Sequence, residues 1–586
     1  MERDRLITWP AVEAMIAEGR IIVIYEGNVL RLDSWLEKHP GGRLAILHMV
    51  GRDATDEINV YHSVAVRNTM KAYRIGRLAG PWINMTPPIR GGVYLSEETS
   101  INNRLVSEEP DDCNSNADEI GSTSSLGLPS DQTSLTSACS SADEDELLRL
   151  SSGVKPSSPE TGIRRRLQRE GFEDTVSDAA CPATTNQISL SPAQFTDLAV
   201  QYDIKRGIQD YPSVDPAVQQ GIIQKYRVLQ RRIEDEGLYE CRYSEYAKEL
   251  VRYTTLFTIS MVALYYRWYM TSAVFLGLFW HQIMFTAHDA GHTAITHNFV
   301  FDTLIGIFIA DFCCGLSMGW WKSSHNVHHL VTNQPEHDPD IQNIPLFATC
   351  PSFFRSLRST YYDFTFIWDA AAEFLVPYQK YTYYPVMGIA RFNLYLLSWL
   401  HVLSRKSWAG RTQAAPRLLL SAEIAFMACY WFLFGYLLLW RALPTWTVRV
   451  AFVLVSHVVT MPLHVQITLS HWGMSTADLG ESESFPQRQL RTTMDVDCPA
   501  WLDFIHGGLQ FQAVHHLFPR LPRHNLRRAQ VLVREFCNDT GIPYSILGFV
   551  DGNGKVLSRL DEVAEQVAHL IACQKHMAVT GESGLI

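Results

Sequence analysis

Histidines gather in three short segments of this 586-residue chain, each with the spacing of one helix face. HDAGH contains His288 and His292, four residues apart, and HNVHH contains three histidines at positions i, i+3 and i+4. QAVHH repeats the second spacing with a glutamine in first place. Residues three or four apart lie on one side of an α-helix. The sequence therefore predicts three helical clusters, of which the second and third consist of His325, His328, His329, Gln512, His515 and His516.

The seven histidines of these clusters point to metal chemistry. They are more than one tetrahedral zinc ion needs, because three or four ligands suffice for zinc. They suit two ions of a redox metal instead. Neutral imidazole binds iron, copper, nickel and zinc alike, so the ligands alone leave the identity of the metal open. A single histidine is usually a hydrogen-bonded core or surface residue, but that explanation fails for three clusters beside apolar segments.

Four further residues near the clusters have more than one interpretation. The Gln512 amide is a weak oxygen ligand, a group that orients a bound water or oxygen, or a packing residue. His471, in LSHWGM, completes the ligand set or lies at a membrane surface. Asp338 and Asp340, in EHDPDIQ, orient ligand imidazoles as hydrogen-bond acceptors or simply form a turn.

A second pair of histidines stands near the N-terminus. His39 begins HPGG, a tight turn, and His62 follows 23 positions later at the end of GRDATDEINVYHS. Two histidines can hold a haem iron from both faces, and such an iron passes electrons because no coordination position stays open. The pattern predicts an electron-transfer haem site.

Long apolar runs would hold the clusters at a membrane. A bilayer core takes roughly 20 helical residues, and we expect about four spans in two pairs. These are Tyr253–Tyr266, Met270–Ala287, Leu418–Trp440 and Val448–Leu469. We do not count Phe299–Trp321 and Tyr381–Leu403 as full spans, since charges or polar breaks interrupt them. The last pair returns the third cluster to the surface that carries the second.

The remaining composition divides the chain. Residues 1–85 alternate short apolar runs with helical stretches, which predicts a small α+β domain. Residues 95–190 are rich in Ser, Asp and Glu and predict a disordered linker, and residues 191–250 predict an amphipathic helical connector. Much of the net charge of −11 belongs to the linker, so it indicates no nucleic-acid partner. The scattered cysteines indicate reduced thiols, and the N-terminus carries no signal-peptide run.

These motifs resemble a known combination of domains. Residues 1–85, with HPGG and DATDEINVYHS, resemble a cytochrome b5 domain, and residues 251–545 resemble the membrane front-end desaturases, whose three histidine boxes match HDAGH, HNVHH and QAVHH. HHLFPRLPRHNL is also typical of those desaturases. The resemblance implies an α+β haem domain joined by a disordered linker to an all-α membrane domain, followed by a tail at 546–586. It implies haem b at His39 and His62, and two iron ions at the box residues.

The long Ser-rich insert is most similar to that of fungal delta-8 sphingolipid desaturases. Such an enzyme would insert a double bond into the long-chain base of a ceramide or sphingolipid in the endoplasmic reticulum membrane, with the haem domain and histidine boxes in the cytosol. Electrons would pass from NADH through a cytochrome b5 reductase to the haem and then to the iron, where O2 reacts. The alternatives are a delta-5 or delta-6 fatty acyl desaturase, a membrane lipid hydroxylase and a non-catalytic haem protein.

Overall fold

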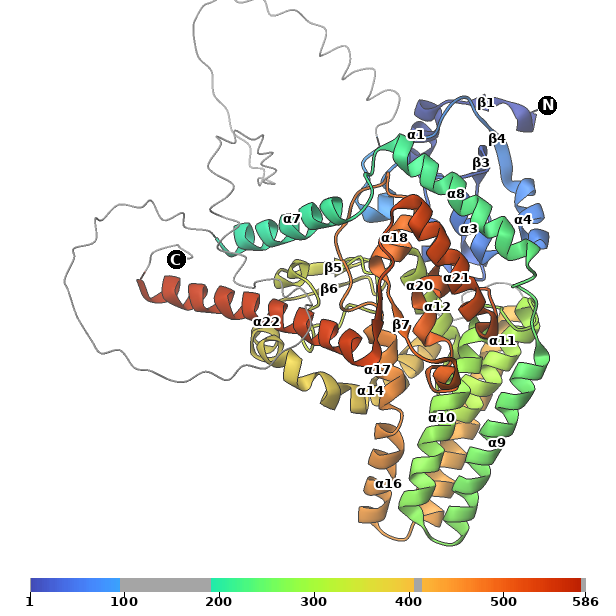
Figure 1. The fold of residues 1–586 in the computed structure, drawn as a ribbon, viewed down its shortest axis with the longest axis vertical. Helices are drawn as coiled ribbons and strands as arrows, with labels where there is room; N and C mark the ends of the chain where they lie inside the picture. Colours follow the sequence, from blue (N-terminus) through green and yellow to red (C-terminus); the bar gives the residue numbers. More distant parts are fainter. Residues whose placement is uncertain (1, 95–190, 405–413, 581–586) are drawn as a thin grey trace, which may run out of the picture. The chain divides into compact units, whose positions relative to one another are not determined.

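This computed structural model describes residues 2–94, 191–404 and 414–580 (Figure 1). The predicted linker, residues 95–190, lies outside the described residues.

The N-terminal domain is α+β, as predicted. Its four strands are β1 (Leu6–Ile7), β2 (Ile22–Tyr25), β3 (Asn28–Arg31) and β4 (Arg74–Leu78), in the sheet order β1-β4-β3-β2. Glu26 and Gly27 both have positive φ, the geometry of a two-residue turn that suits a β2–β3 hairpin. The helices of this domain are α1 (Trp9–Ala17), α2 (Arg43–Leu47), α3 (Thr55–Tyr61) and α4 (Val64–Met70). The sheet and helices place the HPGG turn and the end of α3 next to each other.

Two helices precede the membrane region. In α7 (Pro192–Asp210), Ser191 and Gln194 form a capping box, and in α8 (Pro216–Asp235), Asp215 caps the first turn by accepting from the Ala217 N–H. The apolar face of α8 predicted from the sequence is buried, and its members are Ile222, Tyr226, Leu229 and Ile233. This face packs against the C-terminal part of the chain, where the third histidine cluster lies.

The remainder is mostly helical. The apolar region contains α9 (Tyr243–Tyr265), α10 (Tyr269–Gly291), α11 (Phe299–Ile307), the π-helix η5 (Phe308–Cys313), α12 (Met318–Leu330), α13 (Ala370–Leu375), α14 (Gln379–Leu403), α15 (Ala414–Tyr430), the π-helix η9 (Trp431–Ala442), α16 (Trp446–Val458) and α17 (Met461–Leu469). After it come α18 (Phe485–Thr492), α19 (Asp503–His506), α20 (Gln512–Leu517), α21 (Arg523–Thr540) and α22 (Phe549–Thr580). Two small sheets pair β5 (Leu357–Ser359) with β6 (Phe364–Phe366) and β7 (Asp495–Asp497) with β8 (Ile546–Gly548).

Four stretches of the described residues are long and apolar enough to span a membrane: Tyr269–Gly291, Ala370–Leu403, Leu418–Ala442 and Trp446–Leu469. The number agrees with the sequence prediction, but one member differs. Tyr253–Tyr266 is not among the four stretches, because the first half of α9 is charged and leaves too short an apolar run. Ala370–Leu403 is among the four stretches although it contains Arg391. The guanidinium of Arg391 is buried against the Trp280 ring and donates to the Cys314 carbonyl.

The membrane topology limits which of these stretches can cross the membrane. The N-terminal domain and all three histidine clusters lie together, so the chain must cross an even number of times between them. Since α10 crosses before the first cluster, α9 must cross with it, and Figure 1 shows the two as a hairpin. Between the second and third clusters only two of the three candidate stretches can cross. The bend of 117° between Phe299–Cys313 and Met318–Leu330 fits a re-entrant segment that returns to the same side.

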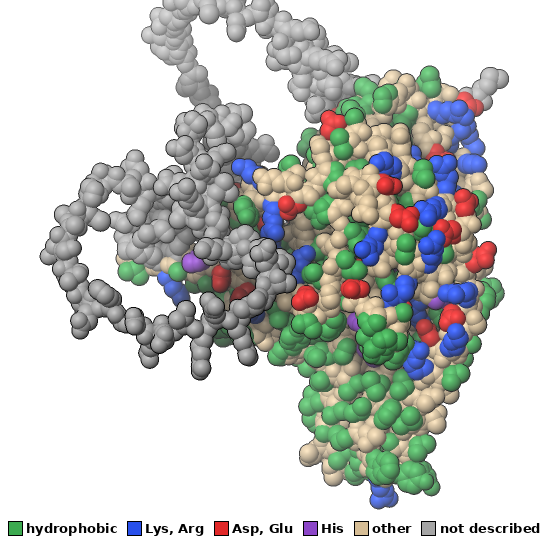
Figure 2. All heavy atoms as spheres, in the orientation of Figure 1, with side chains coloured by type: hydrophobic (Ala, Val, Ile, Leu, Met, Phe, Trp, Pro, Cys, Tyr) green, Lys and Arg blue, Asp and Glu red, His purple; other side chains and the backbone are tan. Residues whose placement is uncertain are grey.

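The outer surface agrees with this arrangement. Figure 2 shows apolar side chains over the lower part of the view, where Figure 1 places α9, α10 and α16, and charged side chains over the upper part. Exposed apolar residues on these helices include Phe257, Val262, Tyr265, Val450 and Leu454. An exposed apolar belt of this kind is typical of a surface that faces lipid.

The N-terminal domain contacts the helical part through ion pairs and an apolar patch. Asp56 accepts from Arg227 of α8 at 2.8 Å, and Glu57 accepts from Arg488 of α18 at 3.3 Å. Beside these pairs, three residues at the end of α12 and directly after it pack into the core of the N-terminal domain: Val327, Leu330 and Val331. Because α12 carries HNVHH, this contact brings the N-terminal domain to the second histidine cluster.

We expect Asp56→Arg and Arg227→Asp each to weaken the docking of the two domains, since either change places like charges together. The double variant should recover part of the loss, with a coupling energy of about 0.5–3 kcal/mol. Distances between spin labels on the two domains measure the docked fraction. Arg20→Asp, an exposed position paired with Glu18, is the control. Additive single effects would contradict the contact.

Candidate metal centres

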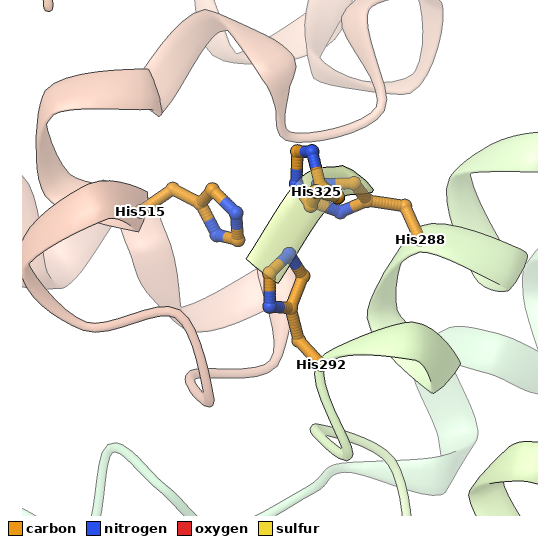
Figure 3. A group of neighbouring side chains, drawn as sticks. All are labelled: His288, His292, His325 and His515. Atoms are coloured by element: carbon orange, nitrogen blue, oxygen red, sulfur yellow. The ribbon is translucent and has the colours of Figure 1, made fainter. Parts of the chain in front are cut away.

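The three histidine clusters meet at one place. His288 and His292 come from the end of α10, His325 from α12 and His515 from α20, and their ligand nitrogens lie within 4.8 Å of one another. Figure 3 shows the four rings turned toward a common centre. This geometry suits one metal ion.

A second group lies beside the first. It contains His328, His516 and His471, again with ligand nitrogens within 4.8 Å. His329 lies between the groups, with its ring centre 4.1 Å from that of His516 and 4.7 Å from that of His292. The two groups share no member, so the arrangement suits two ions. His471, which had two interpretations in the sequence, belongs with the second group.

The state of the imidazoles fits metal binding. Burial, followed by the charges of neighbouring histidines, holds the pKa of His515 and of His516 well below the usual range, so both are neutral at pH 7. The buried Nε2 atoms of His288, His292, His515 and His516 have no hydrogen-bond partner among the described residues. Buried polar atoms are costly when they stay unpaired, and one metal ion in each group would satisfy all four. An all-imidazole set suits iron, copper, nickel and zinc.

Asp338 orients one of these rings. The His328 Nδ1–H donates to its carboxylate, with distances of 2.9 and 3.0 Å to the two oxygens. The same carboxylate accepts from the backbone N–H groups of Asn333 and Asp340 at 2.7 and 2.9 Å. This leaves Nε2 of His328 as the ligand nitrogen. Asp340 itself lies farther away, at 3.7 Å from His328 Nδ1.

Two residues that support the histidines were not predicted from the sequence. Gln489 of α18 accepts from His516 Nδ1 at 2.9 Å and donates to the His329 carbonyl at 2.7 Å, so one amide ties two histidine segments together. Asp495 accepts from the Ala513 N–H at 2.8 Å and holds the start of α20, and burial raises its pKa to about 6. The only signal for Gln489 was a polar segment, FPQRQLRT, which is entirely buried.

Gln512 lies next to His471. Its side chain is buried and hydrogen-bonds the His471 imidazole, and the same imidazole bonds the Thr492 carbonyl through Nδ1 at 3.4 Å. Gln512 therefore contacts a member of the second group, which makes it more than a packing residue.

His39 and His62 face each other in the N-terminal domain. Their ring centres are 6.0 Å apart. Two metal–nitrogen bonds of roughly 2 Å, with the offset of each nitrogen from its ring centre, give a similar separation. Each ring is fixed from behind, since His39 Nδ1 lies 2.9 Å from the Gly42 carbonyl and His62 Nδ1 lies 3.0 Å from the Ile58 carbonyl. Both Nε2 atoms are then the ligand nitrogens, so the pair fits a haem iron.

One aromatic ring lies between the His39–His62 pair and the histidine groups. Tyr61 precedes His62, and its ring packs edge-on against His329, with ring centres 6.2 Å apart. The Gly41 carbonyl of the HPGG turn accepts from the Asn326 amide of HNVHH at 3.5 Å. Both expected haem ligands thus belong to segments that contact the metal-binding helix α12.

Comparison with known proteins assigns both parts to families. Residues 8–79 match the family Cytochrome b5-like Heme/Steroid binding domain, and residues 266–548 match the family Fatty acid desaturase. The chain belongs to the fatty acid desaturases that carry an N-terminal cytochrome b5 domain. It is a multi-pass membrane oxidoreductase that uses haem, iron, O2 and transferred electrons to desaturate a lipid.

Among its relatives, the chain is 48% identical to the Delta 8-(E)-sphingolipid desaturase of Emericella nidulans, with 99% of this chain and 98% of the relative covered. It is 44% identical to the Delta 8-(E)-sphingolipid desaturase of Candida albicans, with 98% of each chain covered. The Delta(8)-fatty-acid desaturase of Helianthus annuus is 36% identical over 60% of this chain and 75% of the relative. The first two similarities extend over nearly the whole chain, whereas the third omits much of it.

We expect Asp338→Asn to lower the affinity for iron by about 10–100-fold, because a neutral amide holds the His328 imidazole less firmly than a carboxylate. Iron per protein after dialysis against a chelator measures this. Asp340→Asn, at the longer distance, should have a smaller effect. Equal iron retention in Asp338→Asn and the unchanged protein would contradict the role of Asp338.

Gln512→Leu should weaken the second group, because His471 loses a hydrogen-bond partner. We expect a loss of roughly half of the bound iron, as one ion of two, and a smaller loss in Gln512→His, which keeps a polar group at the position. Metal analysis together with the absorption or Mössbauer spectrum of the iron tests this. Full iron content in Gln512→Leu would show that the glutamine does not support the metal.

Proposed function

We propose that this protein is a delta-8-(E)-sphingolipid desaturase, which inserts a double bond into the long-chain base of a ceramide or sphingolipid. The main observation in support is the sequence identity of 48%, over nearly the full length, to a relative of that name. Relatives of the same name from Candida albicans and Kluyveromyces lactis, each 44% identical, add support. The (E) geometry is taken from those relatives.

The proposed metal sites follow from the geometry above. His39 and His62 hold haem b, and the two histidine groups hold a pair of iron ions. The catalytic residues are His288, His292, His325, His328, His329, Gln512, His515 and His516, with His471 as a further iron ligand. A haem with two histidine ligands passes electrons, whereas iron with open positions reacts with O2.

The chain itself supplies the surroundings for this chemistry. Burial keeps the imidazoles of His515 and His516 neutral, and Asp338 and Gln489 orient the rings of His328 and His516. The apolar side chains of α10 and its neighbouring helices pack together in one cluster, and such surroundings suit an aliphatic substrate. The ring of Tyr61 shortens the gap between the two metal-binding parts.

We further propose that electrons arrive from NADH through a separate cytochrome b5 reductase. The membrane is that of the endoplasmic reticulum, with the haem domain and the histidine boxes on the cytosolic side. The division of the chain is part of this proposal: a haem domain at 1–85, a linker at 95–190, a helical connector at 191–250, a desaturase domain at 251–545 and a tail at 546–586.

Expression of this chain in a host without delta-8-unsaturated sphingolipids tests the function. We expect a delta-8-(E)-unsaturated long-chain base, detected by mass spectrometry after hydrolysis of the lipids. His39→Ala should abolish haem absorbance and product together, because the haem loses one of its two ligands. His569→Ala, outside both metal sites, serves as the control.

Each other outcome identifies a different enzyme. An unsaturated fatty acid with a saturated long-chain base would indicate a delta-5 or delta-6 acyl desaturase, and a hydroxylated product would indicate a lipid hydroxylase. Full product formation by a haem-free His39→Ala protein would contradict electron donation by the fused domain.

A further inference from the structure

The segment after the third histidine box packs against the haem domain. Leu517, Phe518 and Leu521 belong to the same apolar cluster as Val60 of α3, and Tyr61 packs against that cluster. Since α3 ends immediately before His62, residues 517–521 lie at the expected haem site. Arg520 stands in the middle of this segment.

Arg520 is a cation without a carboxylate partner. No Asp or Glu of the described residues lies within ion-pair distance of its guanidinium. Its Nη2 lies 3.5 Å from Nδ1 of the His297 ring, and its guanidinium lies 5.9 Å from the centre of the Tyr239 ring. Arg67 of the haem domain also has no carboxylate within ion-pair distance among the described residues, and it donates to the neutral Asn59 amide oxygen at 2.7 Å.

Both cations lie near the end of α3, directly before His62. Arg67 donates to Asn59 of α3, and Arg520 belongs to the segment that packs against Val60 and Tyr61. The two guanidinium groups also repel each other, since burial and then the charge of Arg67 lower the pKa of Arg520. Two half-buried cations beside one haem ligand are unfavourable unless an anion lies between them.

Haem b supplies such an anion, because it carries two carboxylate groups on one edge of the ring. A guanidinium binds a carboxylate with two parallel hydrogen bonds, and such charge-assisted pairs are strong when partly shielded from water. The haem domain contributes one cation, and the desaturase domain contributes the other.

We propose that Arg520 of the desaturase domain, together with Arg67 of the haem domain, binds a carboxylate group of the haem, so that the desaturase domain completes the haem site. This inference rests on haem b as the proposed cofactor. The pairing exists only while the two domains are docked. By linkage, bound haem strengthens docking, and docking strengthens haem binding by the same factor.

The test uses the purified full-length chain with haem. We expect Arg520→Gln to release haem about tenfold faster to an excess of apomyoglobin. Its haem midpoint potential should also fall, because removal of a nearby positive charge disfavours the added electron. A fall of about 59 mV corresponds to a tenfold change in the equilibrium constant of a one-electron reduction. Arg520→Lys keeps the charge and should preserve most of the potential. Arg528→Gln, in an exposed pair with Glu236, is the matched control.

Haem dimethyl ester separates pairing from packing, because it lacks both carboxylates. With this haem, Arg520→Gln and the unchanged chain should release haem at equal rates. An equally large effect of Arg520→Gln with the ester, or no effect with haem b, would overturn the proposal while leaving the proposed function intact. A chain that takes up no haem at all would contradict the proposed cofactor as well.

Discussion

The structure depends on packing eight imidazoles against one another, six of which burial keeps neutral. Burial makes the protonated form costly, which leaves the lone pairs ready for metal, but it also leaves nitrogens without hydrogen-bond partners. The scaffold must therefore hold the rings firmly. Ligands come from α10, α12, α20 and the turn after α17, and Asp338 and Gln489 fix the back of two rings. The same requirement sets the membrane topology, because segments that meet at one site must be separated by an even number of crossings.

The haem domain is placed by the same helix that carries the second histidine box. One face of α12 presents His325, His328 and His329 to the metal groups, whereas Val327, Leu330 and Val331 pack into the haem domain. A helix of this kind transmits position directly, since a shift of the haem domain would also move the ligands. The Tyr61 ring, next to His62 and against His329, fills the space between the two parts. Electrons pass more readily through packed atoms than across a gap, so docking favours electron transfer between the two parts.

The ligand histidines were predictable because helical spacing is a local property of the sequence. The i, i+3, i+4 pattern already fixes which rings share a face. Gln489, Asp495 and Arg520 were not predictable, because their roles arise from contacts between segments far apart in the chain. Gln489 contacts residues 160 and 27 positions away. The number of spans followed from apolar length, but the assignment of α9 as a span required the location of the metal site. Gln512 was marked by its place in the motif, and only its contact with His471 showed what it supports.

The ion pairs of the docked contact add little net stability. Burial raises the pKa of Asp56 to about 6 in spite of its pair with Arg227, so ionisation of this carboxyl is not fully compensated by the ion pair. Glu57 and Arg488 are buried in the same contact, and desolvation offsets much of their attraction. Covalent fusion makes strong contacts unnecessary, because a tethered domain has a high effective concentration near its site. The position of the haem domain therefore depends mainly on apolar packing, in which Val327, Leu330 and Val331 share a cluster with its core.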